Sequence, residues 1–326
     1  SSQTPALDRQ TVNALLTQLE RRYDAVYGGV GFSEVNPRMP KFPEPSTLAF
    51  LLHRAADQHD LRAREMALAT LDKMARGGIQ DQVGGGFHRY STDRFWRVPH
   101  FEKMLYDNAQ LASVYADAYA LTTRSDFRRV AKRLADFVLR HMTAPDGGFY
   151  ASVDADSEGR EGAYYVWSRD QLEAVLTDAQ MQLATDLFGL DREPNFEDRY
   201  VLQVVAPLTE IARRRQLPEA DLTEQMDAVL ARLEKVRQER PQPATDTKIL
   251  TAWNGLMIRG MADVGSILGD DRYIAAATRA ADFVLTRLRA SDGRLLRSYR
   301  DGQAKLDAYL EDYALLVDAL IALDRV

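Results

Sequence analysis

The sequence predicts an all-α protein, a six-hairpin (α/α)6 toroid with short β pieces in its glycine-rich connections. Three observations support this fold class. Apolar residues recur at helical spacing through most of the 326 residues. Several of the expected helices are apolar around most of their circumference, as in the inner ring of an α/α barrel. A glycine-aromatic phrase also returns between helices, at intervals of roughly 50–60 residues.

Helical periodicity and capping signals locate ten helices along the chain. Ser125-Asp126 is an N-capping signal, as are Ser168 and the run Thr245-Asp246-Thr247. Pro99 suits the first turn of the fourth helix. The expected helices span residues 8–26, 45–58, 61–76, 100–123, 126–142, 168–188, 219–239, 248–268, 271–290 and 307–324.

The helix expected at 100–123 carries two apolar stripes, and a helix of this kind is packed on two sides. One stripe consists of Phe101, Leu105, Ala112, Tyr115 and Tyr119. The other consists of Met104, Leu111, Val114, Ala118 and Leu121. A complete six-hairpin toroid has more helices than the periodicity locates. We therefore expect one domain, residues 1–326, that is incomplete at its C-terminus.

The recurring phrase reads GGVGF at residues 28–32, GGGF at 84–87, DGGFY at 146–150 and, more weakly, DGRLLRSY at 292–299. One interpretation is a helix C-cap followed by a turn. The interpretation we favour is a toroid whose glycine-rich connections gather at one rim. The strand-like pieces FYASV, AYYVW and YVLQVV lie in or after such connections. We expect a positive φ at one or more of Gly84, Gly85 and Gly86.

Composition and missing motifs exclude several functional classes. The net charge of −6 and the lack of a basic stripe argue against a nucleic-acid partner. Arg213-Arg214-Arg215 is the densest basic run, and we expect it near the end of a short helix, on a solvated face. The chain has no cysteine, and no apolar run approaches the ~20 residues of a membrane span. Dinucleotide, phosphate-loop, zinc-protease and serine-hydrolase motifs are absent. We expect no cofactor, no metal, no membrane partner and, by default, a cytoplasmic location.

The segment GGIQDQVGGGFHRYSTDRFWRVPHFEKMLYDNAQL, residues 77–111, has the highest density of chemically reactive side chains. It combines two of the five histidines with a glycine triplet and with Asp, Glu, Lys, Trp and Asn. It keeps no regular period until its end, and long irregular segments between helices often carry function.

Four phrases of the chain resemble one protein family: PKFPEPSTLAFLL, residues 77–111, DGGFYASVDADSEGREGAYYVW and DTKILTAWNGLMI. This is the thioredoxin-domain-containing family that includes spermatogenesis-associated protein and its bacterial relatives. The resemblance runs from about Gly28 to the last residue. It implies a longer protein in which a thioredoxin-like domain precedes a six-hairpin domain, similar to N-acylglucosamine 2-epimerase and to six-hairpin glycosidases.

The chain departs from the family pattern in three ways. The thioredoxin-like half is absent, and with it the redox motif. The C-terminal part of the barrel is also absent. Val153 stands where relatives often carry an acidic residue. The resemblance implies a barrel of sugar-enzyme ancestry without an assigned reaction. The partners we expect are a small-molecule sugar ligand and the thioredoxin-like domain of the full-length protein.

His100 and His88 are the first candidates for catalysis. Sugar epimerases and isomerases need a base of near-neutral pKa beside a carbonyl, and histidine meets this need. We expect His100 at the start of a helix, where the positive potential favours the neutral, basic form of the imidazole. The structural alternative is that each histidine anchors the loop.

Glu102 and Asp107 complete the catalytic candidates, with Tyr106 and Asn108 as substrate-binding neighbours. A hydroxyl-rich ligand needs convergent carboxylates and amides with an aromatic platform. The structural alternative assigns Glu102 to the helix dipole and pairs Lys103 with Asp107 one turn along a solvated face.

Asp154 and Asp156 fall on the same side of an extended segment and are further substrate-binding candidates. They also suit an acid and base for glycoside hydrolysis, or a turn cap. A calcium loop is not supported, because Tyr165 occupies the position where the template needs a carboxylate.

Lys248, Trp253 and Asn254 form the last substrate-binding group, with Trp96 as a further aromatic candidate. A tryptophan beside an asparagine early in a helix suits stacking on a sugar with an amide contact. Core packing is the alternative for any tryptophan.

Three functions remain open from these residues. The first is a carbohydrate-active enzyme of the epimerase or isomerase kind, and the second is an inverting glycoside hydrolase. The third is a non-catalytic ligand-binding or scaffolding module that works with a thioredoxin-like domain. Two histidines in one pocket would favour the epimerase or isomerase. Two carboxylates across a cleft would favour the glycoside hydrolase. A pocket blocked by aromatic side chains would favour the non-catalytic module.

Overall fold

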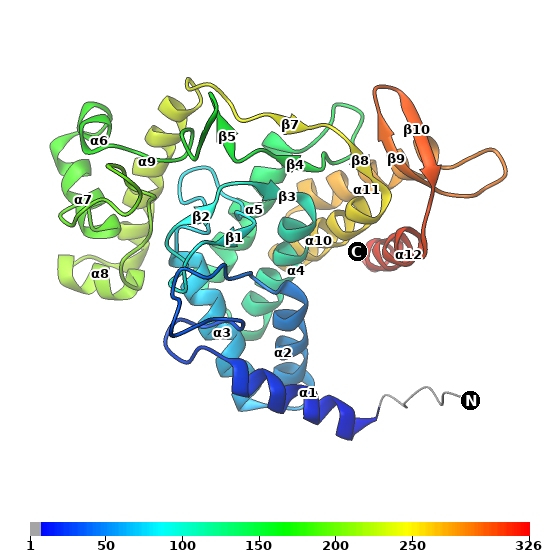
Figure 1. Cartoon of the computed structure of the whole chain (residues 1–326), viewed down its shortest axis with the longest axis horizontal. Coiled ribbons are helices and arrows are strands. Elements are labelled where there is room, and N and C mark those ends of the chain that lie inside the picture. Colours follow the sequence, from blue (N-terminus) through cyan, green and yellow to red (C-terminus); the bar gives the residue numbers. More distant parts are fainter. Residues whose placement is uncertain (1–7) are drawn as a thin grey trace.

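The computed structural model describes residues 8–326, which form twelve helices and ten short strands (Figure 1). The helices are α1 (Arg9–Arg22), α2 (Pro45–Asp57), α3 (Leu61–Arg76), α4 (Leu105–Thr122), α5 (Ser125–His141), α6 (Arg169–Val175), α7 (Asp178–Phe188), α8 (Leu208–Arg215), α9 (Glu219–Arg237), α10 (Thr251–Leu268), α11 (Asp271–Arg287) and α12 (Leu310–Asp324). The predicted helical class with short β pieces is confirmed.

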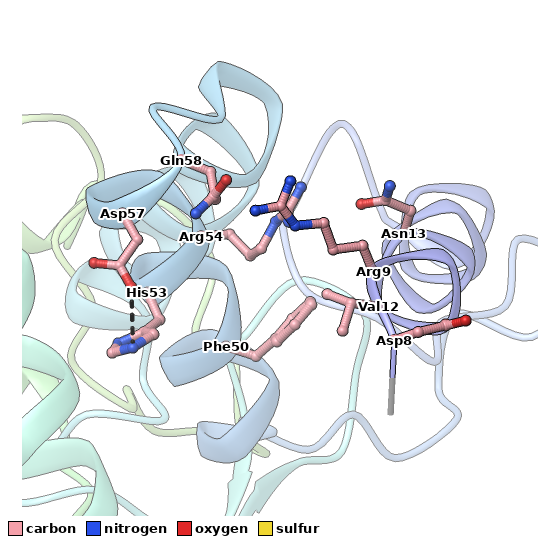
Figure 2. Close-up of a pocket in the computed structure, with 9 residues that line it drawn as sticks. All are labelled: Asp8, Arg9, Val12, Asn13, Phe50, His53, Arg54, Asp57 and Gln58. Atoms are coloured by element: carbon pink, nitrogen blue, oxygen red, sulfur yellow. Dashed lines mark ion pairs between the residues drawn. The ribbon is translucent and has the colours of Figure 1, made fainter. Parts of the chain in front are cut away.

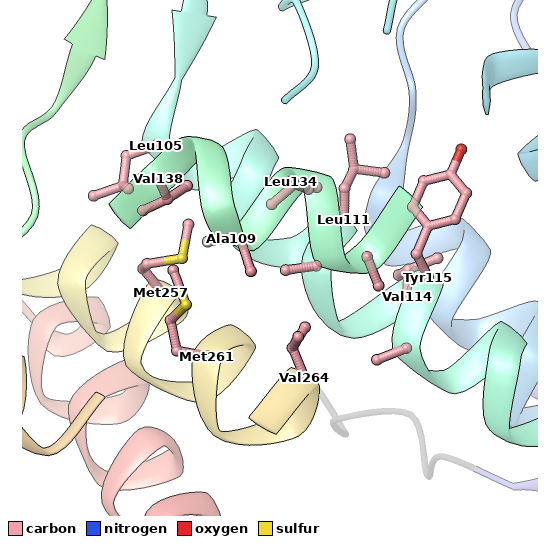
Figure 3. Close-up of a cluster of buried hydrophobic side chains, with 14 of the residues drawn as sticks. Leu105, Ala109, Leu111, Val114, Tyr115, Leu134, Val138, Met257, Met261 and Val264 are labelled. Atoms are coloured by element: carbon pink, nitrogen blue, oxygen red, sulfur yellow. The ribbon is translucent and has the colours of Figure 1, made fainter. Parts of the chain in front are cut away.

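Helical hairpins form an arc in which α2, α4, α10 and α12 follow one another side by side. The second helices of the hairpins pack behind this row, α3 against α2, α5 against α4 and α11 against α10. The row thus has the inner and outer layers of an α/α toroid. Figure 3 shows apolar side chains of α4, α5 and α10 that meet where these three helices pack together.

Two glycines on α10 let the inner helices approach closely. A Cβ on Gly260 would lie 2.6 Å from the carbonyl oxygen of Ala109 on α4. A Cβ on Gly255 would lie 2.8 Å from the backbone of Leu315 on α12. Side chains at these positions would push α10 away from both neighbours. The prediction that the 100–123 region is packed on two sides is confirmed, because α4 buries residues around most of its circumference.

Helices α6, α7, α8 and α9 pack around a separate apolar core, at the left of Figure 1. They lie in the sequence between α5 and α10, which are neighbours in the arc. Periodicity alone could not separate this lobe from the hairpins, because its helices also present apolar faces. The short basic helix is confirmed, since α8 ends with Arg213, Arg214 and Arg215.

The ends of several helices differ from the prediction by a few residues, and two helices differ for reasons that the structure shows. The helix expected at 100–123 begins at Leu105, because the preceding residues form the strands β2 (Pro99–His100) and β3 (Lys103–Met104). The helix expected at 168–188 is two helices, because Thr177 starts a second capping box with Gln180. Strand pairing with other segments delays the start of the first helix, and a capping box divides the second.

The short strands form four small sheets. The strands β1 (Tyr90–Ser91) and β2 pair with each other, and β3 pairs with β4 (Ser152–Val153), which also pairs with β7 (Thr245–Asp246). The strands β5 (Asp156–Ser157) and β6 (Arg160–Glu161) form a hairpin, as do β9 (Leu296–Arg300) and β10 (Gln303–Asp307), with β8 (Ile249–Leu250) beside β9. The piece FYASV contains β4, whereas those at 163–167 and 200–205 are linked by one isolated bridge, Trp167↔Tyr200.

The glycine triplet has the expected backbone. Gly85 and Gly86 have φ of 82° and 75°, so the prediction of positive φ is confirmed. A Cβ on Gly85 would also lie 2.4 Å from the carbonyl oxygen of Arg133, which keeps larger residues out of this turn. Among residues 8–326, every helix is too short or too polar to cross a membrane.

Candidate functional site

The residues between α3 and α4 form a long loop that covers the N-terminal end of α4. Residues 81–88 of this loop are buried. The loop is tied to α4 by Asn108, whose side chain accepts a hydrogen bond from Phe87 N at 2.7 Å and donates one to Phe87 O at 3.0 Å. Successive residues of its extended end face opposite sides. Glu102 is therefore half-buried on one face, while Lys103 is buried on the other.

The Glu102 face meets the first turns of α4 and α10. Arg89 donates from Nη1 to Glu102 Oε2 at 2.9 Å. Tyr106 of α4 and Trp253 of α10 meet edge to face, with ring centroids 4.9 Å apart. Asp107 follows Tyr106 and is 8% exposed. The structure thus brings together four predicted residues at the ends of two inner helices, Glu102, Tyr106, Asp107 and Trp253.

The Asp107 carboxyl has the electrostatics of a proton-transfer group. Burial raises its pKa to about 7, and the charge of Glu102 adds to this while Arg89 opposes it. Its carboxyl oxygens have no hydrogen-bond partner among residues 8–326. A carboxyl that titrates near neutral pH can both take up and release a proton under ordinary conditions.

The positions of Lys103 and Asp107 correct the expected intrahelical pair. Lys103 lies in β3, two residues before α4 begins at Leu105, and its Nζ contacts Asp81 Oδ2 at 2.8 Å. Asp107 is left without a cation in direct contact. Glu102 also precedes the helix, so the helix dipole does not explain it.

His100 lies at the edge of the same face. Its ring stacks on Tyr90 with centroids 5.0 Å apart, and its Nδ1 lies 2.7 Å from Glu161 Oε1. Its Nε2 lies 3.6 Å from Glu102 Oε2. His100 belongs to the strand β2, so the expectation that it begins a helix is wrong. Its surroundings are two carboxylates and an aromatic ring.

His88 faces the opposite side of the loop. It is 1% exposed, its Nδ1 lies 2.8 Å from Phe101 O, and its ring meets Phe101 and Tyr165 edge to face. Burial, reinforced by the charge of Lys103, lowers its pKa to about 3. The imidazole is therefore neutral and anchors the loop. The two histidines of the motif do not share a pocket.

Asn108 and Asn254 have matching places in the fold, each as the fourth residue of an inner helix. Asn254 accepts a hydrogen bond from Phe149 N at 2.8 Å and donates to Phe149 O at 3.0 Å, as Asn108 does with Phe87. Both side chains are fully buried and tie a glycine-aromatic phrase to a helix. We assign them to the fold, because their polar atoms are already engaged.

Trp96 is also engaged within the fold. It is fully buried, and its Nε1 donates to Tyr27 O at 2.9 Å. The Nζ of Lys41 lies 4.8 Å from its ring centroid. A ligand cannot reach either face of this indole without displacing these contacts.

The remaining predicted residues lie on the surface. Asp154 and Asp156 are exposed, and Asp154 Oδ1 accepts a hydrogen bond from Asp156 N at 3.2 Å, as in an Asx turn. Lys248 is exposed and lies 3.0 Å from Asp246. The turn-cap alternative accounts for Asp154, whose side chain accepts this hydrogen bond.

Arg89, Tyr90 and Glu161 contact the cluster but were not singled out from the sequence. Arg89 and Tyr90 directly follow His88 in the motif, so their place in the sequence could have indicated that they lie near the cluster. Glu161 contacts His100 from a position 61 residues further along the chain, in the hairpin of β5 and β6. No local sequence signal indicates this contact.

A pocket of about 520 Å³ lies elsewhere, between α1 and α2 (Figure 2). His53 and Asp57 form an exposed pair there at 3.3 Å, one helical turn apart. Pairs of this kind are common on solvated helix faces. None of the motif residues lines this pocket, and we do not assign it a function.

Known proteins match this chain along most of its length. Human spermatogenesis-associated protein 20 is 39% identical over 349 residues, which cover 95% of this chain and 44% of the human protein. The chain is similar in sequence to this protein over almost its whole length. The mouse protein of the same name is 38% identical over 98% of this chain and 45% of its own length. The chain spans less than half the length of these relatives. No protein-family model matches it.

Solved structures of carbohydrate enzymes align with most of the chain at low similarity. A sugar epimerase from a ruminal bacterium has 11% identity and a TM-score of 0.39, with 97% of this chain and 98% of that chain covered. Cellobiose 2-epimerase from Spirochaeta thermophila has 15% identity and a TM-score of 0.37, with 98% and 99% covered. Likenesses at these scores identify no reaction.

Proposed function

We propose that this chain is a carbohydrate-active domain of the spermatogenesis-associated protein 20 family, of the epimerase or isomerase kind, with Asp107 as the proton-transfer group. The carrying observation is the buried Asp107 carboxyl, whose pKa is raised to about 7 beside an aromatic pair. A group of this pKa suits removal of a proton from the carbon next to a carbonyl.

The neighbours of Asp107 have distinct roles in this proposal. Tyr106 and Trp253 offer apolar ring edges and faces to a sugar. The Arg89 guanidinium stabilises the negative charge that develops on the carbonyl oxygen when the carbon loses its proton. Glu102 holds Arg89 in place through the 2.9 Å contact. Asp107 takes the proton as a carboxylate and returns it as a carboxylic acid, so the sugar gains and loses no atoms.

The reassignment from histidine to aspartate follows from geometry. His88 is buried on the other face of the loop, and His100 is held between Glu161 and Glu102. We retain His100 as a residue that orients Glu102. The inverting-hydrolase alternative needs a second carboxyl free to act, and Glu102 is already paired with Arg89.

A ligand-binding module without catalysis is the second candidate. The edge-to-face contact of Tyr106 with Trp253 favours it, because the two rings occupy space between α4 and α10 that a substrate would otherwise enter. In this case the chemistry would belong to another part of the longer protein, such as a thioredoxin-like domain.

Proton exchange in heavy water distinguishes the two candidates. The chain is incubated with reducing monosaccharides and disaccharides, and the sugars are followed by proton NMR. Deuterium entering beside the anomeric carbon supports the enzyme, and the Asp107→Asn variant should reduce the rate by about 10²–10⁴-fold. A sugar that binds without any exchange supports the module instead.

Asp117→Asn is the matched control. Asp117 lies on the same helix as Asp107 and has an exposed side chain, and partial desolvation together with the charge of Asp263 raises its pKa to about 6. It is ten residues away, or about 15 Å along the helix. Exchange lost equally in both variants would contradict the role of Asp107.

A further inference from the structure

A buried cluster of three charges lies on the Lys103 face of the motif loop. Asp81 Oδ2 accepts a hydrogen bond from Lys103 Nζ at 2.8 Å. Asp81 also accepts two hydrogen bonds from Arg237, one to each carboxylate oxygen, at 2.8 and 3.0 Å. The three side chains are 4% exposed or less. Arg237 comes from the last turn of α9, so the cluster joins the lobe to the arc.

The charges of this cluster do not balance. One carboxylate faces two cations, and a second carboxylate nearby, Glu234, lies 3.3 Å from Arg140 and offsets that residue. Arg133 adds a further positive charge, with Nη2 donating to Gln82 O and Val83 O. Uncompensated charge in a buried site is costly. Buried cations in excess are therefore a reason to look for an anion.

A pocket of about 240 Å³ opens directly onto the cluster. Asp81, Lys103 and Arg237 line it, as do the side chains of Arg140 and His141. Among the residues that the structure describes, Arg237 Nε is buried and has no hydrogen-bond partner. Buried polar atoms usually have a partner in the protein, in water or in a bound ion.

The field in this pocket is positive. The pKa of His141 is lowered to about 4 by burial and by Lys103, Arg140 and Arg237. The walls are aromatic, with Lys103 Nζ 4.2 Å from the Phe137 ring centroid and Arg237 Cζ 4.9 Å from that of Tyr164. The pocket offers guanidinium and ammonium donors beside apolar rings.

We propose that this pocket binds the oxyanion of a small molecule, a phosphate or a carboxylate, through Arg237 and Arg140 with its organic part against the aromatic walls. Asp81 occupies both Nη atoms of Arg237, so its Nε is the donor left for a ligand, and guanidinium donors form strong charge-assisted hydrogen bonds to oxyanions. The site is separate from the Asp107 cluster, since Glu102 and Lys103 face opposite sides. A bound anion would neutralise the excess charge where the lobe meets the arc.

Calorimetric titration with inorganic phosphate and, separately, with acetate tests the proposal at constant ionic strength. We expect saturable binding of one or both by the wild-type chain. Arg140 is 42% exposed at the rim, so Arg140→Gln should fold, and we expect it to weaken binding about tenfold or more. Arg128→Gln, an exposed arginine on the same helix, is the matched control and should bind as wild type.

A second variant tests whether the volume of the pocket matters for anion binding. Thr245 lies half-buried at the lining, and Thr245→Leu should narrow the pocket and weaken binding without any change of charge. Binding of phosphate but not acetate identifies a phosphate site, and binding of both identifies a general oxyanion site. The proposal fails if neither anion binds, or if the two variants bind as tightly as the Arg128→Gln control.

Discussion

The two faces of the motif loop place adjacent residues in opposite environments. On one face Glu102 is half-exposed beside Asp107, whose carboxyl lacks a partner and has its pKa raised to about 7. On the other face Lys103 is buried beside Asp81, whose pKa is held well below its usual range by Arg237 and Lys103 against the effect of burial. Burial alone therefore does not set the chemistry of a carboxyl here. The presence or absence of a buried cation decides it.

The two faces of the loop therefore have different functions. A carboxyl satisfied by two cations is fixed in its ionised form and holds elements together. A carboxyl buried without a cation exchanges its proton near neutral pH and suits catalysis. The following variants test the assignment, from the largest expected effect to the smallest.

Asp81→Asn should have the largest effect on stability. It leaves the Lys103 and Arg237 charges buried without their partner, which costs about 3–5 kcal/mol in the free energy of unfolding. Urea unfolding followed by circular dichroism measures this loss. Asp154→Asn, at an exposed aspartate, should change stability by less than about 0.5 kcal/mol. Equal effects of the two variants would remove the structural role that we give to Asp81.

Asn108→Ala should cost about 1–3 kcal/mol, because it leaves the backbone groups of Phe87 buried without partners. Asn254→Ala should cost a similar amount, because its contacts with Phe149 match those of Asn108. Unfolding by urea provides the measurement. A stable Asn108→Ala variant with weakened sugar binding would instead return this residue to the ligand site.

Asp107→Asn should raise stability at pH 8 by about 1–3 kcal/mol, because it removes an ionised carboxyl from a site without a cation. The pKa of Asp107 is higher in the folded state, about 7, than the ordinary value of 3.8. The folded state therefore binds the proton more tightly, and this contribution to stability is present at low pH and is lost as the pH rises from about 4 through 7. Melting temperatures across this range should fall less in the variant than in the wild type.

His100→Gln should have the smallest effect, about 0–1 kcal/mol, since its contacts with Glu161 and Glu102 are partly exposed to solvent. If His100 orients Glu102, the variant should slow proton exchange into the sugar without lowering the melting temperature. An unchanged rate of proton exchange would show that His100 has no part in orienting Glu102.

The sequence predicted the helical class and most helix boundaries, because periodicity and caps act locally. Examples are α2 at Pro45–Asp57 and α3 at Leu61–Arg76, expected at 45–58 and 61–76. It missed the start of α4, because the strand pairs Lys103↔Val153 and Tyr90↔His100 depend on distant residues.

The sequence also identified the segment that contributes most of the candidate site, but it could not predict which face of the loop each residue occupies. His88 and His100 look equivalent in the motif, yet one is buried against Phe101 and the other is half-exposed beside Glu161. Whether Lys103 pairs with Asp107 or with Asp81 depends on where the helix begins. The Asp81–Arg237 contact spans 156 residues and left no local signal.

The most direct test of the account is a titration of the Asp107 carboxyl by carbon-13 NMR, with the signal assigned by its loss in Asp107→Asn. The account predicts a pKa near 7, raised by burial without a neighbouring cation in contact. A pKa near 3.8 would show that Asp107 is solvated or paired, and it would contradict the proposed proton-transfer role.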